Sequence, residues 1–181
     1  METVKGFKDV SGQEALRQEK IKEIIVRVFK QYGFEPAETP IVEYEDFVKQ
    51  GNEQDEAVSD IFKLQDKGKR KLALRYEFTF QIKRLAINKK LPYKRYQIGS
   101  VFRDEPISAN RFRQFTQCDV DVVGATIKDE AEILVLTIKI LKELGINAVV
   151  QVNNRKLLNE ILEKEGIKKK EEVIRIVDKL D

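Results

Sequence analysis

The sequence predicts an α+β fold in which an antiparallel sheet is flanked by helices. A long amphipathic helix over 11–32 comes first, short strand-like segments separated by turn residues fill 34–124, and an apolar helix follows over 129–144. Helices and strands therefore do not alternate as βαβ units, which would indicate a parallel sheet. We expect helices at 11–32, 43–50, 78–88, 129–144, 155–165 and 170–180, and strands at 60–64 and 71–74, as a pair within 91–124, and at 149–152.

The first predicted helix has clear start and stop signals. Ser11 and Glu14 have the spacing of a capping box, and Gly33 follows the last residues of the helical repeat. Pro36 and Pro40 then exclude helix and predict an extended segment. A long helix followed by a proline-marked strand is also suited to pairing with a second copy of the chain.

The length and composition indicate one domain, or one domain with the start of another. The chain has 181 residues, of which 41% are hydrophobic and 36% charged. The polar segment 51–59 is expected to be a mobile loop. Because the sequence becomes more polar after Val150, we place a boundary near Asn153, with a core over 1–152 and the opening of a further region over 153–181.

The composition excludes several kinds of chemistry. With Cys118 as the single cysteine and no histidine, the sequence predicts no internal disulfide, no Cys/His zinc site and no Ser-His-Asp relay. The net charge of +3 creates no global field that demands a nucleic-acid partner. No stretch reaches the ~18 apolar residues of a membrane span, and the N-terminus has no apolar signal region. We therefore expect a cytoplasmic protein without membrane association.

The segment 101–124 holds the main candidate site. We expect two strands joined by a polar loop, with Arg103 and Glu105 following the first strand and with Arg111 and Arg113 in the loop. Guanidinium groups match the geometry of carboxylates and phosphates, so this hairpin suits a bound zwitterion and a polyphosphate. Each arginine alone is better explained as a surface solubilising group, but their concentration on one hairpin favours a binding site.

The return strand of this hairpin separates polar from apolar side chains. Gln117, Asp119 and Asp121 alternate with Val120 and Val122, so the two sets lie on opposite faces. The polar face is either a solvated sheet surface or a site that contacts polar ligand edges, and the apolar neighbouring strands favour the site. The sequence contains no GxGxxG or GxxxxGK loop and no nucleophile elbow, so phosphate groups would have to be bound by side chains.

A second candidate lies where a strand meets a helix, in the segment 74–79, LRYEFT. A carboxylate at Glu77, with Thr79 beside it, suits the α-ammonium group of a ligand. Equally, Glu77 could face the dipole of a helix whose first turn contains Thr79. The local sequence favours neither interpretation.

Three blocks of the sequence, taken in order, resemble the class II aminoacyl-tRNA synthetases, and specifically the histidyl-tRNA synthetase family. The first helix with GFEPAETPIVE is similar to motif 1, LALRYEFT to the histidine loop, and FRDE…RFRQFTQCDVDVVG to motif 2. The opening KGFKDV and the segment VNNRKLLNEILEKEG also resemble family segments. The variants LRYE and QCDVD are more similar to the archaeal and eukaryotic branch. The resemblance implies that the predicted strands belong to a class II antiparallel sheet.

The resemblance implies roles for the ATP-side residues. Arg103 would bind the α-phosphate and the carboxylate, and would be the catalytic group because it neutralises charge that develops during attack. Glu105 would receive the adenine amino group, Phe115 would stack on the adenine ring, and Arg111 would reach the γ-phosphate. Mg²⁺ would be bound through the phosphates, and no residue of the chain is assigned as a metal ligand.

The resemblance likewise implies the contacts of histidine. Glu77 and Thr79 would bind its α-ammonium group. Gln117 and Asp121 would complete the amino-acid pocket, with Asp121 placed to accept a hydrogen bond from the imidazole. No general base is needed, because the attacking carboxylate is already a nucleophile.

The function that the resemblance implies is histidine–tRNA ligation: ATP-dependent activation of histidine and transfer to tRNA(His), by a homodimer joined through motif 1. No segment resembles motif 3, the RGLDYY and GGRYD blocks or the anticodon-binding domain. We therefore expect a truncated piece that aminoacylates negligibly alone. The alternative is a non-catalytic paralogue, a histidine-binding regulatory subunit of ATP phosphoribosyltransferase, and a third possibility is a minimal dimerisation fragment. Retention of FRDE with Arg111 favours the ligase, because a regulator needs no ATP clamp.

Overall fold

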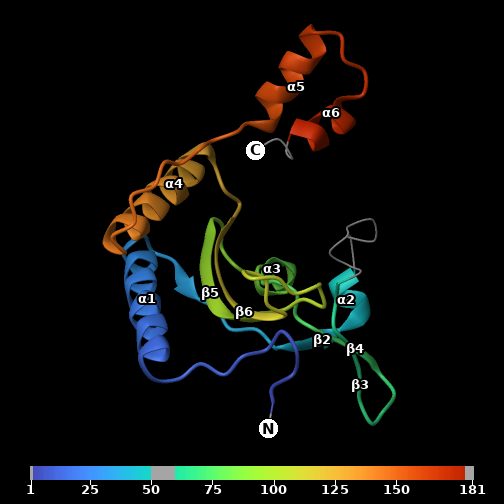
Figure 1. Cartoon of the computed structure of the whole chain (residues 1–181). Helices are drawn as coiled ribbons and strands as arrows, with labels where there is room; N and C mark the ends of the chain where they lie inside the picture. Colours follow the sequence, from blue (N-terminus) through green and yellow to red (C-terminus); the bar gives the residue numbers. More distant parts are fainter. Residues whose placement is uncertain (1, 50–59, 178–181) are drawn as a thin grey trace. The chain divides into compact units, whose positions relative to one another are not determined.

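The computed structural model describes residues 2–49 and 60–177, so the expected loop at 51–59 lies outside the described residues. Residues 1–147 form one compact unit, and residues 148–181 form a second, smaller one. The first unit contains both sheets and the helices that cover them (Figure 1). It is an α+β unit, as the order of the elements predicted.

The central sheet has three strands in the order β1–β5–β6. β5 (Tyr93–Phe102) and β6 (Gln114–Val123) form the predicted antiparallel hairpin and are paired over their whole length. β1 (Glu35–Pro36) runs parallel to β5 and lies within the segment that its prolines predicted to be extended. The hairpin is therefore the structural centre of the unit, and its loop (103–113) carries the candidate arginines.

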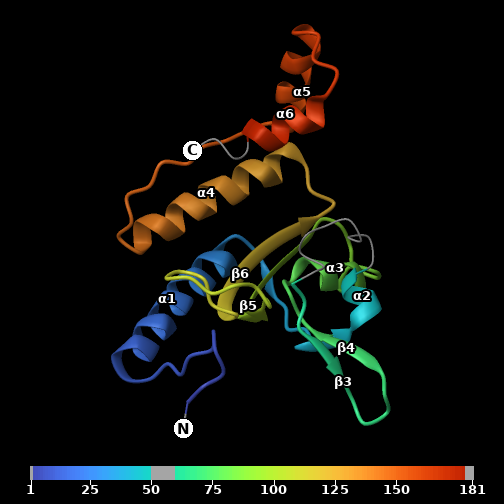
Figure 2. The ribbon, with the colours of Figure 1, turned by 45° about the vertical axis from the view of Figure 1, so that its right-hand side comes forward.

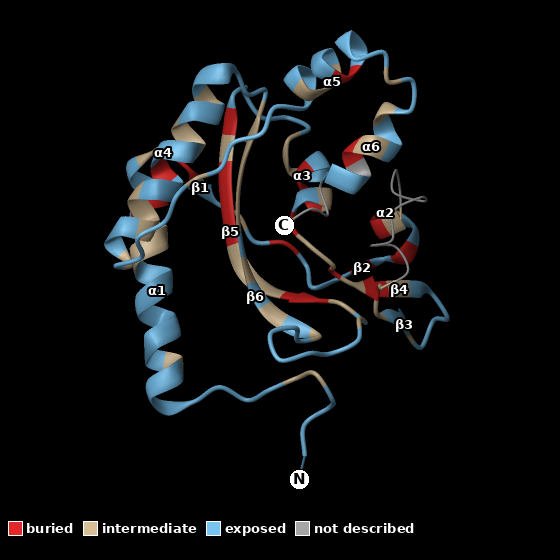
Figure 3. Cartoon of the chain, turned by 45° about the horizontal axis from the view of Figure 1, so that its top comes forward, coloured by how far each residue is buried: buried red, intermediate tan, exposed pale blue. Residues whose placement is uncertain are grey.

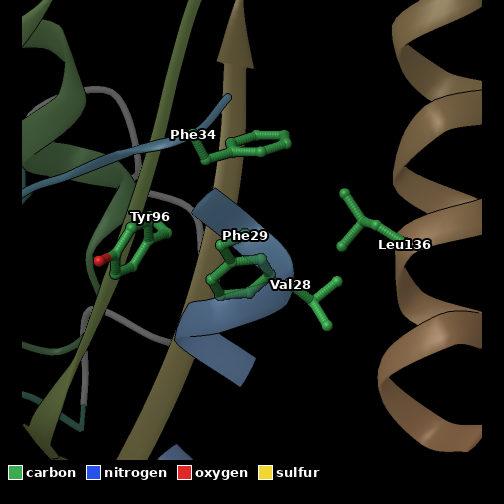
Figure 4. Close-up of a cluster of buried hydrophobic side chains, with 5 residues drawn as sticks. All are labelled: Val28, Phe29, Phe34, Tyr96 and Leu136. Carbon is green, nitrogen blue, oxygen red and sulfur yellow. The ribbon is translucent and has the colours of Figure 1, made fainter. Parts of the chain in front are cut away.

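Two long helices, α1 (Gly12–Gln31) and α4 (Ile127–Glu143), pack against one face of the hairpin, as Figures 1 and 2 show. The short helix α3 (Thr79–Leu85) lies on the opposite face. None of the helices in the described part of the chain is both long and apolar enough to cross a membrane. The core between the long helices and the hairpin is shown in Figure 4, and its buried members are Val28, Phe29, Phe34, Tyr96 and Leu136.

A second sheet contains β2 (Val42–Tyr44), β4 (Lys71–Leu74) and β3 (Lys63–Gln65), in that order and all antiparallel. The predicted pair 60–64 and 71–74 is thus confirmed, with the first strand beginning later than expected. The helix α2 (Glu45–Lys49) follows β2 directly. Its Val48 packs with Ile61 and Ala73 in a small core of its own.

The N-terminal capping of two helices, α1 and α4, differs from what the sequence predicted. Ser11 is the N-cap of α1, but its side chain makes no capping hydrogen bond, and Glu14 pairs with Lys8 at 2.7 Å instead. The predicted capping box is therefore wrong. A real capping box begins α4, where the Asp129 carboxylate accepts from both the backbone N–H and the hydroxyl of Thr126, each at 2.8 Å.

The second unit contains two helices, α5 (Arg155–Lys164) and α6 (Lys170–Val177). Asn154 caps α5 by accepting hydrogen bonds from two backbone N–H groups. The predicted strand at 149–152 is wrong. Val149 is 91% exposed and Val152 70%, and no described strand pairs with them, so their β-branched side chains alone do not produce a strand.

Candidate ligand-binding site on the β5–β6 hairpin

The register of the hairpin brings the candidate residues onto one face. Arg95 lies opposite Asp121, and Gly99 opposite Gln117. Residues opposite each other in an antiparallel pair point to the same side, so the odd-numbered residues of β5 and β6 form one face, which we call the site face. The predicted alternation along β6 is thus observed. β5 is buried along most of its length, whereas β6 is only partly covered (Figure 3).

Arg103 lies at the loop end of the site face, between two aromatic rings. Its guanidinium carbon is 4.4 Å from the ring centroid of Tyr76 and 5.1 Å from that of Phe115. Its Nη2 donates a hydrogen bond to Oε1 of Gln117 at 3.3 Å. Its buried Nε has no partner among the described residues. A cation that is held by two rings and retains an unused donor is suited to binding an anionic oxygen.

The loop arginines are paired with the two acids that follow β5. Nη1 of Arg111 lies 3.3 Å from Oε2 of Glu105, and Nη2 of Arg113 lies 3.2 Å from Oδ1 of Asp104. The Arg111 side chain is 72% exposed, and exposed pairs of this kind contribute little to stability. Arg111 can therefore exchange Glu105 for a stronger anion at small cost.

The other end of the site face is rich in carboxylates. Oδ2 of Asp121 is 2.6 Å from Nη2 of Arg95, and Nε2 of Gln117 donates to Oδ2 of Asp119 at 2.9 Å. Burial raises the pKa of Asp121, the positive charge of Arg95 opposes that rise, and the charges of Asp119 and Glu77 add to it. A ligand that brings cationic or N–H donor groups here would relieve this repulsion.

Glu77 and Thr79 lie at the start of α3, as predicted. Oε1 of Glu77 accepts a hydrogen bond from the backbone N–H of Phe80 at 2.5 Å. This is the helix-terminus interpretation of Glu77, and its charge also helps to raise the pKa of Asp121. Thr79 is exposed in the first turn of the helix.

Arg75 supports the site, although no role was predicted for it from the sequence. Its buried guanidinium donates from Nε to the carbonyl of Ser100 at 2.7 Å and from Nη1 to that of Thr39 at 2.8 Å. It therefore links β5 to the extended segment after β1. Burial lowers the pKa of Arg75, and the charge of Glu38 partly opposes this shift. The alternation of Arg75 with Glu77 was the one sequence signal for it.

Gly6 and Phe7 of the N-terminal segment contact the hairpin at its loop end. The carbonyl of Gly6 accepts from the N–H of Arg113 at 2.9 Å, and the Phe7 ring stacks on Phe102 with centroids 6.4 Å apart. Gly6 has φ +87°, and a Cβ there would lie 2.8 Å from Cγ of Arg113.

The described residues contain no cluster of three or more His, Cys, Asp or Glu side chains arranged to hold a metal ion.

The fold and this site together define a class of protein. The structure superposes on the crystal structure of histidyl-tRNA synthetase from Nostoc sp. PCC 7120 with a TM-score of 0.86 and 29% identity, covering 99% of this chain and 43% of that one. An ATP phosphoribosyltransferase regulatory subunit/histidyl-tRNA synthetase from Bacillus halodurans C gives a TM-score of 0.69 at 24% identity, covering 81% and 38%. The fold is that of a class II aminoacyl-tRNA synthetase catalytic domain.

The sequence comparison identifies the family. Residues 6–181 match the profile of histidyl-tRNA synthetase. Histidine–tRNA ligase 1 of Bacillus cereus (strain ATCC 10987 / NRS 248) is 42% identical over 188 residues, which cover 100% of this chain and 43% of that protein. The chain belongs to the histidyl-tRNA synthetase family, and it spans less than half the length of this relative. These relatives come from bacteria. The sequence variants LRYE and QCDVD of this chain had instead been interpreted as more similar to the archaeal and eukaryotic branch of the family.

Proposed function

We propose that the β5–β6 hairpin binds ATP and histidine side by side, and that a protein with the full length of its relatives uses it for histidine–tRNA ligation. The position of Arg103 is the observation that carries this proposal. Its guanidinium is held between the rings of Tyr76 and Phe115, and it lies between the loop with Arg111 and the carboxylates that end at Asp121. The two reacting anions, the α-phosphate and the carboxylate of histidine, would meet at this cation.

ATP would bind at the loop end. Arg103 would contact the α-phosphate, Glu105 the adenine amino group, and Phe115 the adenine ring. Arg111 would leave Glu105 to bind the γ-phosphate, an exchange that its exposure makes easy. Mg²⁺ would come with the nucleotide and draw its ligands from the phosphates, which is the usual mode for this ion.

Histidine would bind at the carboxylate end. Its α-ammonium group would lie against Glu77 and Thr79, and its side chain against Gln117 and Asp121. Burial raises the pKa of Asp121, and the charges of Asp119 and Glu77 add to that rise. The N–H donors of histidine would reduce the repulsion between these carboxylates. The surplus of negative charge at this end supports an amino-acid subsite.

Activation requires positioning and charge neutralisation. A carboxylate oxygen of histidine forms a bond to the α-phosphorus while the bond from that phosphorus to the bridging oxygen breaks, and pyrophosphate leaves with the electron pair. No proton moves in this step, so no general base is required. Arg103 would neutralise charge on the pentacoordinate phosphorus, where a preorganised donor acts most strongly. Transfer of the histidyl group to the end of tRNA(His) would follow.

A homodimer through α1 and the following extended segment is part of the proposal. The N-terminal half of α1 leaves Leu16 57% exposed and Ile21 38% exposed, although both belong to its apolar pattern. A second copy of the chain would cover them. Sedimentation equilibrium at high concentration tests this, and a monomer would contradict it.

Calorimetric titration of the chain with Mg·ATP and with histidine tests the main proposal. We expect both to bind, and we expect Arg103→Lys to lose most ATP binding because an amine cannot reproduce the planar guanidinium between two rings. Arg70→Lys is the matched control, since Arg70 pairs with Asp66 on the exposed β3–β4 turn. Failure of either ligand to bind wild type at millimolar concentration contradicts the ligase.

The same titration separates the ligase from the regulatory paralogue. A chain that binds histidine but no ATP would favour a histidine-binding regulatory subunit, which the fold of the B. halodurans protein also accommodates. The ion-paired Arg111 and Glu105 favour the ligase, since a histidine sensor has no use for them. In ATP–pyrophosphate exchange, we expect the 181 residues alone to show negligible turnover beside an intact synthetase.

A further inference from the structure

Arg95 is fully buried on the site face and only partly satisfied. Its side chain is 0% exposed, and its Nη2 donates to the carbonyl of Phe78 at 2.9 Å. The same atom is 2.6 Å from Oδ2 of Asp121, but the pair lacks the angles of a hydrogen bond. Nε and Nη1 have no partner among the described residues. A buried cation with so little compensation is costly, so packing alone does not explain it.

The other arginines near the site face have partners other than Asp121. Arg75 is engaged by the carbonyls of Ser100 and Thr39. Arg103 lies at the loop end and donates to Gln117. In the described part of the chain, Arg95 is the one cation that pairs with Asp121.

The charge of Arg95 favours the ionised form of Asp121. It is partly buried, and it lies in the negative field of Asp119 on the same strand and of Glu77 before α3. Each of these influences favours its protonated form, and the charge of Arg95 opposes them. An ionised carboxylate only accepts hydrogen bonds, whereas a protonated one also donates. The state of Asp121 therefore decides which ligand side chains the pocket accepts.

We propose that Arg95 is a positioning residue that makes the amino-acid subsite selective for an imidazole side chain, by holding the Asp121 carboxylate ionised and oriented as an acceptor for a ligand N–H. This inference rests on the proposed function, because it assumes that histidine binds on the site face. It adds a residue that does not touch the ligand and acts only through Asp121. Selectivity of this kind is a difference between two affinities, so it is tested with two ligands.

The first test compares histidine with 3-(2-thienyl)alanine, which has a five-membered aromatic ring of similar shape and no ring N–H. Calorimetry with the full chain at neutral pH should show that wild type prefers histidine. Arg95→Met should weaken histidine binding about tenfold or more, with little change for thienylalanine, because only histidine donates to Asp121. Arg95→Lys keeps a cation but loses the guanidinium Nη2 that contacts both the Phe78 carbonyl and Asp121, so its preference should be intermediate.

The control variant is Arg84→Met. Arg84 donates two hydrogen bonds to the Glu43 carboxylate, at 3.0 and 2.7 Å, so its removal breaks another guanidinium–carboxylate pair, which links α3 to β2 and does not include Asp121. We expect it to leave both affinities unchanged. Equal losses for histidine and thienylalanine in the Arg95 variants would show a merely structural role and overturn the inference. If Arg95→Met does not fold, Arg95→Lys decides the question. A preference of Arg95→Lys for histidine over thienylalanine equal to that of wild type would also overturn the inference.

The second test needs no ligand. Carbon-13 NMR titration of the Asp121 carboxyl should give a higher pKa in Arg95→Met than in wild type, and an unchanged pKa contradicts the inference. The two proposals fail differently. If wild type binds neither amino acid, the proposed function is wrong and the selectivity falls with it. If histidine binds normally but Arg95 affects neither selectivity nor titration, the proposed function stands and this inference is wrong.

Discussion

The Nη2 atom of Arg75 lies 2.9 Å from the position that a Cβ atom on Gly99 would occupy. The guanidinium is the end of a long side chain, which could in principle move aside. However, Arg75 is only 3% exposed, and hydrogen bonds to the carbonyls of Ser100 and Thr39 hold its guanidinium in place. The guanidinium therefore crosses β5 at a point where only a glycine leaves room. The site face is in this way tied to the segment that follows β1.

Gly99→Ala should therefore destabilise the chain. We expect a loss of about 1–3 kcal/mol in the free energy of unfolding, because the added methyl group must displace a buried and hydrogen-bonded guanidinium. Urea unfolding followed by circular dichroism measures it. Gly68→Ala is the control, since the nearest atom to its Cβ would be 3.4 Å away. Equal stabilities of the two variants would show that Arg75 moves freely.

The capping box of α4 should make stability depend on pH. Hydrogen bonds from the backbone and hydroxyl of Thr126 lower the pKa of Asp129 below its ordinary value of 3.8. A carboxylate with a lowered pKa stabilises the fold above its ordinary pKa, and this contribution is lost as the pH falls through the lowered value. The melting temperature of wild type should therefore exceed that of Asp129→Ala at pH 7. The difference between the two melting temperatures should become smaller as the pH falls towards 3.

The matched control for this prediction is Glu130→Ala, which removes an acid from the same helical turn without touching the capping box. Its melting temperature relative to wild type should vary much less over the same pH range. A gap between wild type and Asp129→Ala that is constant with pH would contradict the assigned role of the carboxylate.

Cys118 should react slowly although it is exposed. It lines a groove between α1 and β6, where the surrounding protein and the charge of Asp119 raise its pKa to about 11. Relative to an ordinary value of 9.0, about a hundredfold less thiolate is present at pH 8. Iodoacetamide should therefore alkylate the native chain far more slowly than the urea-unfolded chain. Equal rates would contradict the raised pKa.

Local patterns were sufficient where one element decides the outcome. The period-2 alternation of Gln117, Asp119 and Asp121 correctly predicted a polar face, because side chains alternate along any strand. Gly33 and Gly145 ended their helices as expected, and both have a positive φ. The loop arginines were predicted from their concentration on one hairpin, although their ion pairs with Asp104 and Glu105 were not.

Features that depend on a second element could not be found in this way. Arg95 faces Asp121 only in the observed register, and no local signal fixes which residues of two strands are opposite each other. The same limit explains the wrong strand at 149–152, since a strand needs a partner that its own residues do not specify. The Glu14 side chain does not complete the expected capping box because it pairs with Lys8.

Chemical-shift mapping of the isotope-labelled chain tests the central claim most directly. Mg·ATP should perturb the backbone amides around Arg103, Glu105 and Phe115, and histidine those around Glu77 and Asp121, with both sets meeting at Gln117. With both ligands present, the Arg103 and Gln117 signals should shift further than with either ligand alone. Perturbations confined to other parts of the chain, or none at millimolar ligand, would contradict a site built on the β5–β6 hairpin.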